Sequence, residues 1–387
     1  MSQEDTMTPK ERWLAILERE EVDRLPMDYW GTPEVSAKLI RHFGLSDKEQ
    51  IEIVRDLGLS RFQKSNNNLA VPESKVLERE VFKQLNIDFV VRLENKYVGP
   101  EIPLGSDPYG CRYKTIEYAD GSYIECSHNP LAEFNSVEEI ENEYQWPDPD
   151  WWDYSTISDQ VKGYEDYPIR AGGSEPFLFY KYLRGDEKAF LDLVLNPEIV
   201  HYILEKLFGL TKENTKRMYE QIPEKENKLL LTYVNEDLGS QKGLLYSPTH
   251  IQEFLLPGMK EMMDLAHENG AYVFHHDDGS IRKILPDLIK TGIDILNPVQ
   301  WRLKDMDREG LKQDFGKQII FHGGVDNQHT LPFGSVEDVQ IEVEENIKIL
   351  GEGGGYIIAP CHNIQPNTPI ENILALYETG YKFGSQI

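Results

Sequence analysis

The sequence is poor in cysteine and has no long apolar run, and both shortages narrow the class of protein. Its three cysteines, Cys111, Cys126 and Cys361, include no C-x-x-C spacing, which argues against a disulfide framework and favours a reducing, cytoplasmic environment. No uninterrupted apolar segment approaches the roughly 18 residues that span a bilayer. The N-terminal residues "MSQEDTMTPKERWL" have no signal-peptide pattern. We therefore expect neither membrane insertion nor export.

Basic residues are also few relative to acidic ones. Lys and Arg number 40 against 67 Asp and Glu, so the formal net charge is −27. This charge would repel nucleic acid and anionic membranes, and no Lys/Arg cluster reverses it locally. What the sequence does have is 40% hydrophobic residues over 387 positions, enough for a sizeable core and within the size range of a single α/β barrel.

Strand-like and helix-like segments alternate along the chain. The predicted strands are 24–30, 88–93, 167–173, 228–234, 271–275, 293–300, 317–325 and 356–361, separated by helical stretches such as 35–43, 187–220, 247–268, 280–292 and 303–314. We expect Ser335 to cap one of the last helices and Thr368 to cap the final one, with Glu371 completing a capping box. Eight strands in this alternation predict an α/β fold, a single (β/α)8 TIM-type barrel.

One segment departs from the alternation. Residues 109–130 alternate like an antiparallel hairpin that turns at "ADG", and we interpret them as an insertion into the barrel. Residues 1–23 precede the first strand as a helical extension. We therefore expect one domain over residues 1–387, forming a monomer or a homodimer.

Polar residues follow the predicted strands with unusual regularity. In a barrel of this type the site lies at the carboxyl ends of the strands, so these residues are the functional candidates. They are Asp28, Glu236, Asp237, His275, His276, Asp277, Asp278, Gln300, His322, Asp326, Cys361 and His362. Strands that end this consistently in Asp, Glu, His and Cys indicate a site more strongly than any single member does.

The stretch "FHHDDGS", residues 274–280, concentrates these candidates. His275 and His276 are neighbours on a strand and should point to opposite faces, so only one of them faces the mouth. Either Asp278 or Ser280 could be the N-cap of the next helix. With Ser280 as the cap, His276 and Asp278 are free to converge on a metal ion.

Each candidate also has a structural interpretation. An isolated histidine is more often a hydrogen-bonded structural residue than a ligand, and a cysteine at a strand end is most often a small buried hydrophobe. The combination raises the odds of a site. Imidazole nitrogen, carboxylate oxygen and thiolate sulfur are all zinc ligands, so His276, Asp278 and Cys361 are the predicted set, with a position left for water or substrate.

Several longer segments together resemble the uroporphyrinogen decarboxylase superfamily. They are "MTPKERWLAILEREEVDRLPMD", "LTYVNEDLGSQKGLLYSPTHIQEFLLPGMKEMMDLAHENGAYVFHHDDGS", "DILNPVQ", "FHGGVD" and "APCHNIQPNTPIENILAL", and they occur in the family's order over nearly the whole chain. The resemblance implies a (β/α)8 barrel with its site at the carboxyl-terminal mouth.

The superfamily contains metal-free decarboxylases and zinc-dependent methyltransferases, and two features favour the second branch. The decarboxylases carry an arginine-rich segment after the first strand, where this chain has "MDYWGTPEV". The methyltransferases carry an H-x-C-G motif and a cysteine near the last strand. The matching positions are His276, Asp278 followed by Gly279, and Cys361, so an aspartate replaces the first cysteine. A carboxylate in that place suits activation of oxygen better than activation of a thiol.

The resemblance then implies a methyltransferase that moves a methyl group from a small, O-methylated compound to cobalamin on a corrinoid partner protein. Zinc would make the oxygen of the donor a better leaving group. We expect Asp237, Glu236 or His322 to orient the substrate or supply a proton. The residues expected to contact the substrate are Asp28, Tyr29, Gln241, Gln300 and Asp326.

Two other functions stay open at this point. A metal-independent decarboxylase or related lyase would act on a small carboxylated substrate through Asp28, Asp237 or His322. A binding protein without catalysis would keep the barrel to sense a ligand or dock a partner. Zinc content distinguishes the metal-independent decarboxylase from the zinc-dependent methyltransferase. The binding protein is identified if a corrinoid protein binds, if at all, without methyl transfer.

Overall fold

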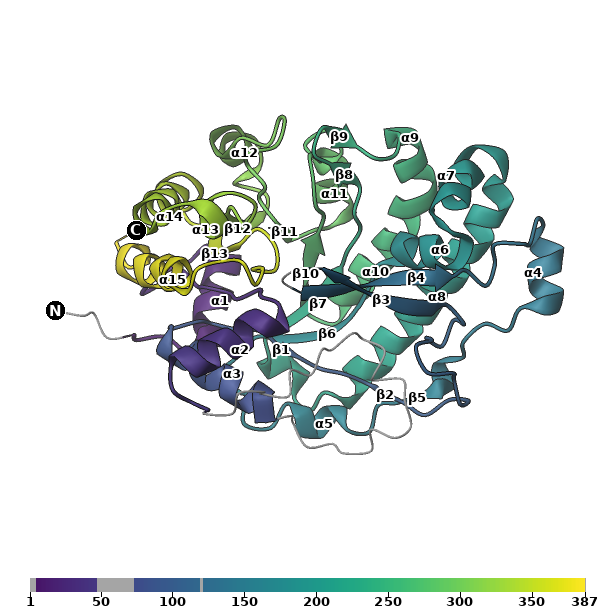
Figure 1. The fold of residues 1–387 in the computed structure, drawn as a ribbon, viewed down its shortest axis with the longest axis horizontal. Helices are drawn as coiled ribbons and strands as arrows, with labels where there is room; N and C mark the ends of the chain where they lie inside the picture. Colours follow the sequence, from purple (N-terminus) through teal and green to yellow (C-terminus); the bar gives the residue numbers. More distant parts are fainter. Residues whose placement is uncertain (1–4, 47–72, 119–120, 387) are drawn as a thin grey trace.

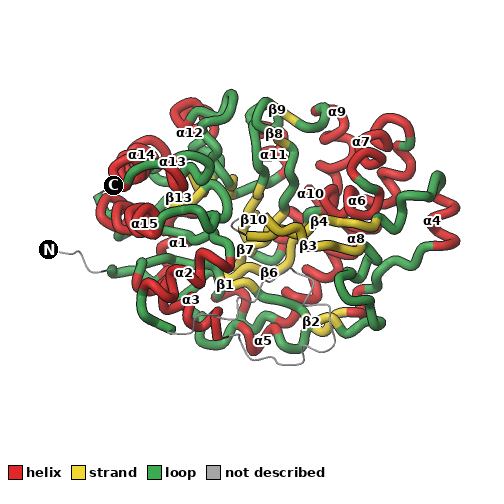
Figure 2. The backbone as a smooth tube through the Cα atoms, in the orientation of Figure 1, coloured by secondary structure: helices red, strands yellow, loops and turns green. Residues whose placement is uncertain are grey.

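A curled parallel sheet forms the centre of the protein. The computed structural model describes residues 5–46, 73–118 and 121–386. Seven strands lie in the order β1-β6-β7-β10-β11-β12-β13, and every neighbouring pair is parallel. Figure 2 shows these strands inside a layer of helices, which is the arrangement of a TIM-type barrel. The strands are β1 (Val91–Arg92), β6 (Ile169–Ser174), β7 (Leu230–Val234), β10 (Ala271–His276), β11 (Ile295–Asn297), β12 (Ile320–Val325) and β13 (Tyr356–Pro360).

The first predicted strand, 24–30, contributes only an isolated bridge. Met27 pairs in parallel with Ile358 of β13, and on its other side its carbonyl oxygen accepts from the Asp88 N–H at 2.7 Å, just before β1. Met27 therefore holds the eighth position, between the two edges of the sheet. The expectation of a full strand here was wrong, because Pro26 has no N–H to donate to a ladder.

Helices cover the outside of the sheet (Figure 1). Those preceding β7 are α1 (Pro9–Glu18), α2 (Pro33–His42), α3 (Glu73–Gln84), α4 (Val137–Glu143), α5 (Ile157–Gln160), α6 (Pro176–Arg184), α7 (Asp186–Leu195) and α8 (Pro197–Gln221). Those following it are α9 (Pro248–His250), α10 (Leu256–Glu268), α11 (Leu285–Thr291), α12 (Arg308–Phe315), α13 (Thr330–Phe333), α14 (Val336–Leu350) and α15 (Ile370–Gly384). Short helical turns are η2 (Pro149–Trp151), η3 (Lys225–Asn227) and the π-helical η4 (Ile251–Leu255).

Three predicted helix starts can be compared with the structure. Ser335 caps α14 through a capping box with Asp338, as predicted. Thr368 does not cap α15, because the helix begins one residue later and Pro369 takes the cap position. Neither Asp278 nor Ser280 caps a helix, since α11 begins only at Leu285. The Ser280 hydroxyl instead donates to the Lys304 carbonyl at 2.6 Å.

The predicted insertion is an antiparallel hairpin. Strands β3 (Arg112–Tyr118) and β4 (Gly121–His128) pair with a bulge at Arg112 and Tyr113. The predicted turn at 119–121 lies partly outside the described residues. Two smaller antiparallel pairs also lie outside the main sheet: β2 (Lys96–Tyr97) with β5 (Trp152–Asp153), and β8 (Gly239–Ser240) with β9 (Gly243–Leu244).

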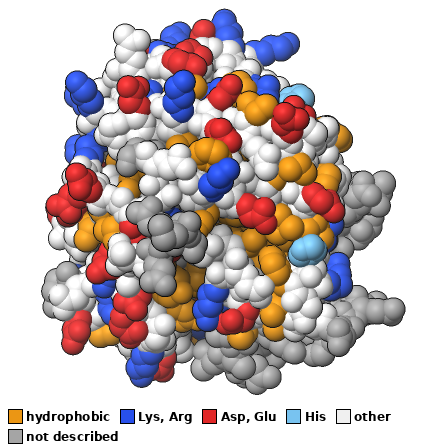
Figure 3. All heavy atoms as spheres, turned by 90° about the vertical axis from the view of Figure 1, so that its left-hand side faces the viewer, with side chains coloured by type: hydrophobic (Ala, Val, Ile, Leu, Met, Phe, Trp, Pro, Cys, Tyr) orange, Lys and Arg blue, Asp and Glu red, His pale blue; other side chains and the backbone are white. Residues whose placement is uncertain are grey.

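One hydrophobic cluster connects the sheet to its helices, from Trp13 of α1 to Tyr377 of α15. That the whole chain is a single domain stays a prediction. On the face shown in Figure 3, acidic and basic side chains are interspersed. None of the helices in the described part of the chain has the length and apolarity needed to cross a membrane.

Candidate metal-binding site at the barrel mouth

Three ligand-type side chains meet at the carboxyl ends of β10 and β13. Ligand atoms of His276, Asp278 and His362 all lie within 4.8 Å of one another. The Asp278 Oδ2 atom is 3.9 Å from His276 Nε2 and 3.7 Å from His362 Nε2. Two imidazoles and one carboxylate are a donor set that zinc accepts at catalytic sites.

A chain of hydrogen bonds fixes which nitrogen of His276 faces this group. The His276 Nδ1 atom lies 2.5 Å from Asn297 Oδ1, and the Asn297 Nδ2 atom lies 2.7 Å from His322 Nδ1. An amide oxygen only accepts, so Nδ1 of His276 carries the proton and its Nε2 keeps a free lone pair. A second-shell partner of this kind selects the tautomer that binds a metal.

His322 continues the chain to Asp28. Asn297 donates to His322 Nδ1, which leaves the proton on Nε2, and Nε2 donates to Asp28 Oδ2 at 3.0 Å. His322 is fully buried in β12. Its predicted catalytic role stays a prediction, but its contacts are those of a residue that positions Asn297.

Trp30 forms a wall of the site. Its ring stacks on His276 with centroids 5.3 Å apart, and its Nε1 donates to Asp28 Oδ2 at 3.0 Å. Asp28, predicted to bind substrate, is 4% exposed and holds Trp30 and His322 in place. Asp28 therefore positions residues that contact His276 and Asn297.

One oxygen of Asp278 has surroundings that suit a bound cation. Burial raises the pKa of Asp278, while His276 and His362 lower it. Burial lowers the pKa of His362. The Asp278 Oδ1 atom is buried and has no hydrogen-bond partner. A buried oxygen without a partner is costly, and a bound cation would satisfy it. The three residues therefore fit a divalent metal ion.

Gly279 and Gln300 shape the turn that carries Asp278. Gly279 has φ +105°, and a Cβ there would lie 2.4 Å from the carbonyl carbon of Gly239. Its N–H donates to Gln300 Oε1 at 2.6 Å. Only glycine fits this position, and Gln300 uses its side-chain oxygen to hold the turn.

Cys361, the predicted third ligand, lies outside the group of His276, Asp278 and His362. It is buried, and its Sγ atom is 3.3 Å from the Val299 carbonyl oxygen. Burial raises its pKa well above the ordinary value, which disfavours the thiolate that binds metals. Its N–H bonds to Val325, so it continues the strand, and the next side chain, His362, faces the mouth instead.

The two acids predicted after β7 have different environments. Asp237 lies beside the metal group, where its Oδ1 accepts from the Asp278 N–H at 3.3 Å. Glu236 is 1% exposed and accepts from the Phe177 N–H, at the start of α6, at 2.7 Å. Burial raises the pKa of Glu236 well above its usual value. The Asp237 side chain therefore bonds to Asp278, whereas Glu236 reaches the group through its backbone N–H, which donates to the His276 carbonyl oxygen at 3.1 Å.

Glu175, which follows β6, was missed by the sequence analysis. Burial, and then the nearby Asp237, raise its pKa to about 7. Arg170 and Lys181 oppose this shift. A carboxyl group with this pKa can give and take a proton near neutral pH. The signal was present, because Glu175 is the first charged residue after the predicted strand 167–173.

The other histidine and the other aspartate of "FHHDDGS" pack against the end of β7 and the loop after it. His275 and Asp277 are both fully buried, with Nε2 and Oδ2 3.4 Å apart. Burial lowers the pKa of His275 to about 4 and raises that of Asp277. The Asp277 Oδ1 atom accepts from the N–H groups of Leu238 and Gly239. The pair is therefore neutral and orders the loop after β7.

Two residues predicted to contact substrate have other surroundings. The Tyr29 hydroxyl is 3.1 Å from Ser36 of α2, its ring contacts Phe82 of α3, and burial raises its pKa. Gln241 is exposed, with Nε2 3.4 Å from Gln328 Oε1. Their roles in substrate binding stay predictions.

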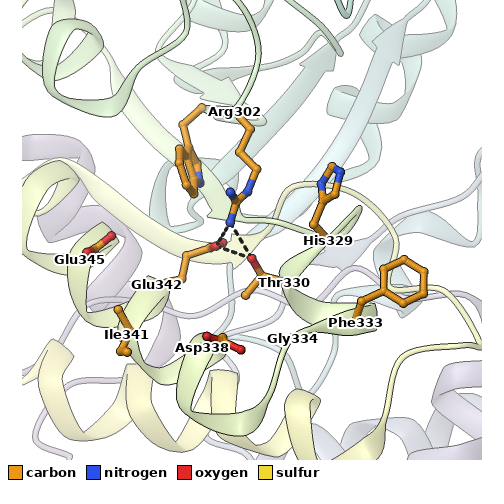
Figure 4. A pocket seen from close by; sticks show the side chains of 10 residues that line it. Arg302, His329, Thr330, Phe333, Gly334, Asp338, Ile341, Glu342 and Glu345 are labelled. Carbon is orange, nitrogen blue, oxygen red and sulfur yellow. Dashed lines mark hydrogen bonds and ion pairs between the residues drawn. The ribbon is translucent and has the colours of Figure 1, made fainter.

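Asp326, the remaining predicted substrate contact, is paired. Its Oδ2 lies 2.6 Å from Arg302 Nε. Arg302 also bonds to Thr330 and Glu342 at the edge of a surface cavity of about 440 Å³ (Figure 4). Asp326 therefore holds the wall between this cavity and the mouth.

The fold and these contacts define an α/β barrel protein with a candidate metal site at its carboxyl-terminal mouth. The chain belongs to the uroporphyrinogen decarboxylase family, whose model, "Uroporphyrinogen decarboxylase (URO-D)", matches residues 115–383. The resemblance stated from the sequence is thereby confirmed.

Individual relatives are distant. The chain is 28% identical to uroporphyrinogen decarboxylase of Prochlorococcus marinus (strain MIT 9211), over 51% of this chain and 59% of that protein. It is 23% identical to that of Pseudoalteromonas atlantica (strain T6c / ATCC BAA-1087), over 57% and 56%. The chain thus spans little more than half the length of these relatives. A solved structure named "methyltransferase from Methanosarcina mazei" is similar over 97% of this chain and 99% of that one, with 18% identity and a TM-score of 0.67, which shows the fold.

Proposed function

We propose that the protein is a metal-dependent methyltransferase that takes a methyl group from a small methylated compound, with an O-methyl compound as the first candidate, and passes it to a corrinoid protein. The observation that carries the proposal is the group of His276, Asp278 and His362, with one buried carboxylate oxygen unpaired. The name of the Methanosarcina mazei structure agrees with it.

The residues of the site would divide the work. His276, Asp278 and His362 would hold the metal, which when bound would supply Lewis acidity toward the leaving oxygen. Asn297 keeps the His276 lone pair directed at the metal position. Trp30 limits the approach of the donor on the His276 side.

Loss of the methyl group leaves an oxygen that needs a proton, and Glu175 is the group suited to provide it. Its pKa of about 7 means that an appreciable fraction is protonated at neutral pH. Asp237 accepts from the Asp278 N–H, and its charge raises the pKa of Glu175, which keeps the Glu175 proton in place.

Metal content tests this proposal. The protein, purified without added metal, should contain about one metal ion per chain, and elemental analysis would distinguish zinc from iron, which accepts a similar donor set. His276→Ala, Asp278→Ala and His362→Ala should lose the metal, while Cys361→Ala, the matched control, should keep it. Metal-free protein that transfers methyl groups would refute the proposal. Loss of metal in Cys361→Ala together with retention of metal in His362→Ala would restore the ligand set predicted from the sequence.

A metal-independent decarboxylase is the second candidate, because both curated relatives carry that activity in their names. Against it, the segment after the first strand lacks arginine, and Asp28 is already bonded to His322 and Trp30. Release of carbon dioxide from a small carboxylic acid by the metal-depleted protein would favour this candidate.

A further inference from the structure

The β3–β4 hairpin places two of the three cysteines side by side. They are separated in the sequence and belong to no short motif. Cys111 directly precedes β3, and Cys126 lies on β4 opposite Tyr113. Both thiols point at one acceptor, the Tyr182 carbonyl oxygen of α6, with Sγ to oxygen distances of 3.4 Å and 3.7 Å. Because both sulfurs lie within reach of the same oxygen atom, they also lie close to each other.

The two thiols differ in accessibility and in acidity. Cys111 is fully buried, whereas Cys126 is half-buried and also contacts the His128 carbonyl oxygen at 3.4 Å. The neighbouring Cys111 lowers the pKa of Cys126, while Cys126 and burial raise the pKa of Cys111. The more accessible sulfur is therefore the better nucleophile, and the buried sulfur next to it can react second.

We propose that Cys111 and Cys126 form a reversible disulfide when the protein meets a peroxide, so that the hairpin carries a thiol modification site separate from the barrel mouth. The Cys126 thiolate attacks the peroxide, the O–O bond breaks, and a sulfenic acid and a hydroxide ion form. The Cys111 sulfur then attacks the sulfenic sulfur, an S–S bond forms and water leaves. Both sulfurs are oxidised, and the peroxide is reduced to two molecules of water.

Such a disulfide would belong to the labile kind. Disulfides in a reducing compartment are mostly transient and sense redox conditions. The bond would close the hairpin beside α6, the helix whose first turn donates the Phe177 N–H to Glu236. Figure 1 shows β3 and β4 beside the helices that follow β6. Oxidation would remove the S–H groups near the Tyr182 carbonyl oxygen and leave Asn129, which donates to the same oxygen at 2.8 Å.

The test is thiol counting on the full chain after treatment with hydrogen peroxide. Two of the three thiols should disappear, the mass should fall by that of two hydrogen atoms, and a non-reducing peptide map should show a Cys111–Cys126 link that dithiothreitol reverses. Cys361→Ser, the matched control, should form the same link. Oxidised protein should also melt at a higher temperature than reduced protein, because the link constrains the unfolded chain.

Cys126→Ser, at a half-buried position, keeps the test informative if substitution of the buried Cys111 prevents folding. In this variant the Cys111 thiol should survive peroxide, and the melting temperature should not depend on oxidation. Three results would overturn the proposal: Cys126 oxidised to a sulfonic acid while Cys111 still reacts with iodoacetamide, a link between two chains, or a Cys111 thiol lost equally fast without Cys126.

Discussion

Two clusters of charged side chains lie at opposite ends of the strands, and they differ in burial and in how completely their charges are paired. At the amino-terminal end, Asp88 bonds to Arg12 at 2.5 Å and to Arg24 at 2.7 Å. Arg12 also bonds to Asp23 at 2.7 Å. At the mouth, Asp278 Oδ1 has no partner. A buried charge that is fully paired holds structure, whereas an unpaired one indicates a position left for a ligand.

The amino-terminal cluster ties the α1 extension to the barrel. Trp13 is fully buried, and its Nε1 donates to the Asp88 carbonyl oxygen at 2.8 Å. Asp88 also accepts from the Met27 N–H at 3.0 Å. Because Met27 occupies the eighth strand position, this cluster fixes the place where the edges of the sheet meet.

The largest expected effect on stability is at Asp88. Asp88→Ala would leave two buried guanidinium groups without their shared partner and should lower the free energy of unfolding by about 3–5 kcal/mol. Urea unfolding measures this directly. Asp150→Ala removes the partner of Arg217 in an exposed pair of 2.6 Å and serves as the control, with a change below about 1 kcal/mol. Equal losses of stability in the two variants would show that the buried cluster around Asp88 stabilises the fold no more than an exposed ion pair does.

An intermediate effect, on metal affinity, is expected at Asn297. Asn297→Ala removes the acceptor that fixes the His276 tautomer and should weaken metal binding about 10–100-fold. Asn297→Asp keeps an acceptor and should lose less affinity. Competition with a chelator measures both, and Asn269→Ala on the outer helix layer is the control. Unchanged affinity in Asn297→Ala would show that the hydrogen-bond chain does not position His276.

The smallest effect is the pH dependence of stability at Glu175. Its folded pKa, about 7, lies above 4.5, the ordinary pKa of a glutamate side chain. Its protonated form therefore favours the folded state. This contribution is fully present below the unfolded pKa and is lost as the pH rises through 7.

Between about pH 5 and about pH 8 the Glu175 contribution to the free energy of unfolding should be lost, and Glu175→Gln should abolish this loss. We expect it to be on the order of 1 kcal/mol, because the group is partly solvated. Urea unfolding at the two pH values measures it in metal-depleted protein. Glu205→Gln, at an exposed position of α8, should follow the unmodified chain. A variant that loses as much stability as the unmodified chain on raising the pH would show that Glu175 titrates normally.

The sequence predicted most of the fold because its signals are local. Seven of the eight proposed strands form the sheet, and the hairpin at 109–130 lies where its alternation placed it. Helix starts were less secure. A capping residue can be recognised in sequence, but α15 takes Pro369 and not Thr368 as its cap residue, and α11 begins only at Leu285, beyond Ser280.

For the site, the sequence by itself determined which side chains stand at the strand ends, and so identified His276 and Asp278. The tertiary structure decided the rest. It places His362, and not Cys361, beside His276 and Asp278, since neighbouring residues on an extended chain point in opposite directions and only the strand's register fixes which one faces the mouth. Which of these residues bind a metal stays a prediction. The tertiary structure also joined Asp28, His322, Asn297 and His276 into one chain of hydrogen bonds. These residues come from four separate strand positions, and only the curvature of the sheet brings them together.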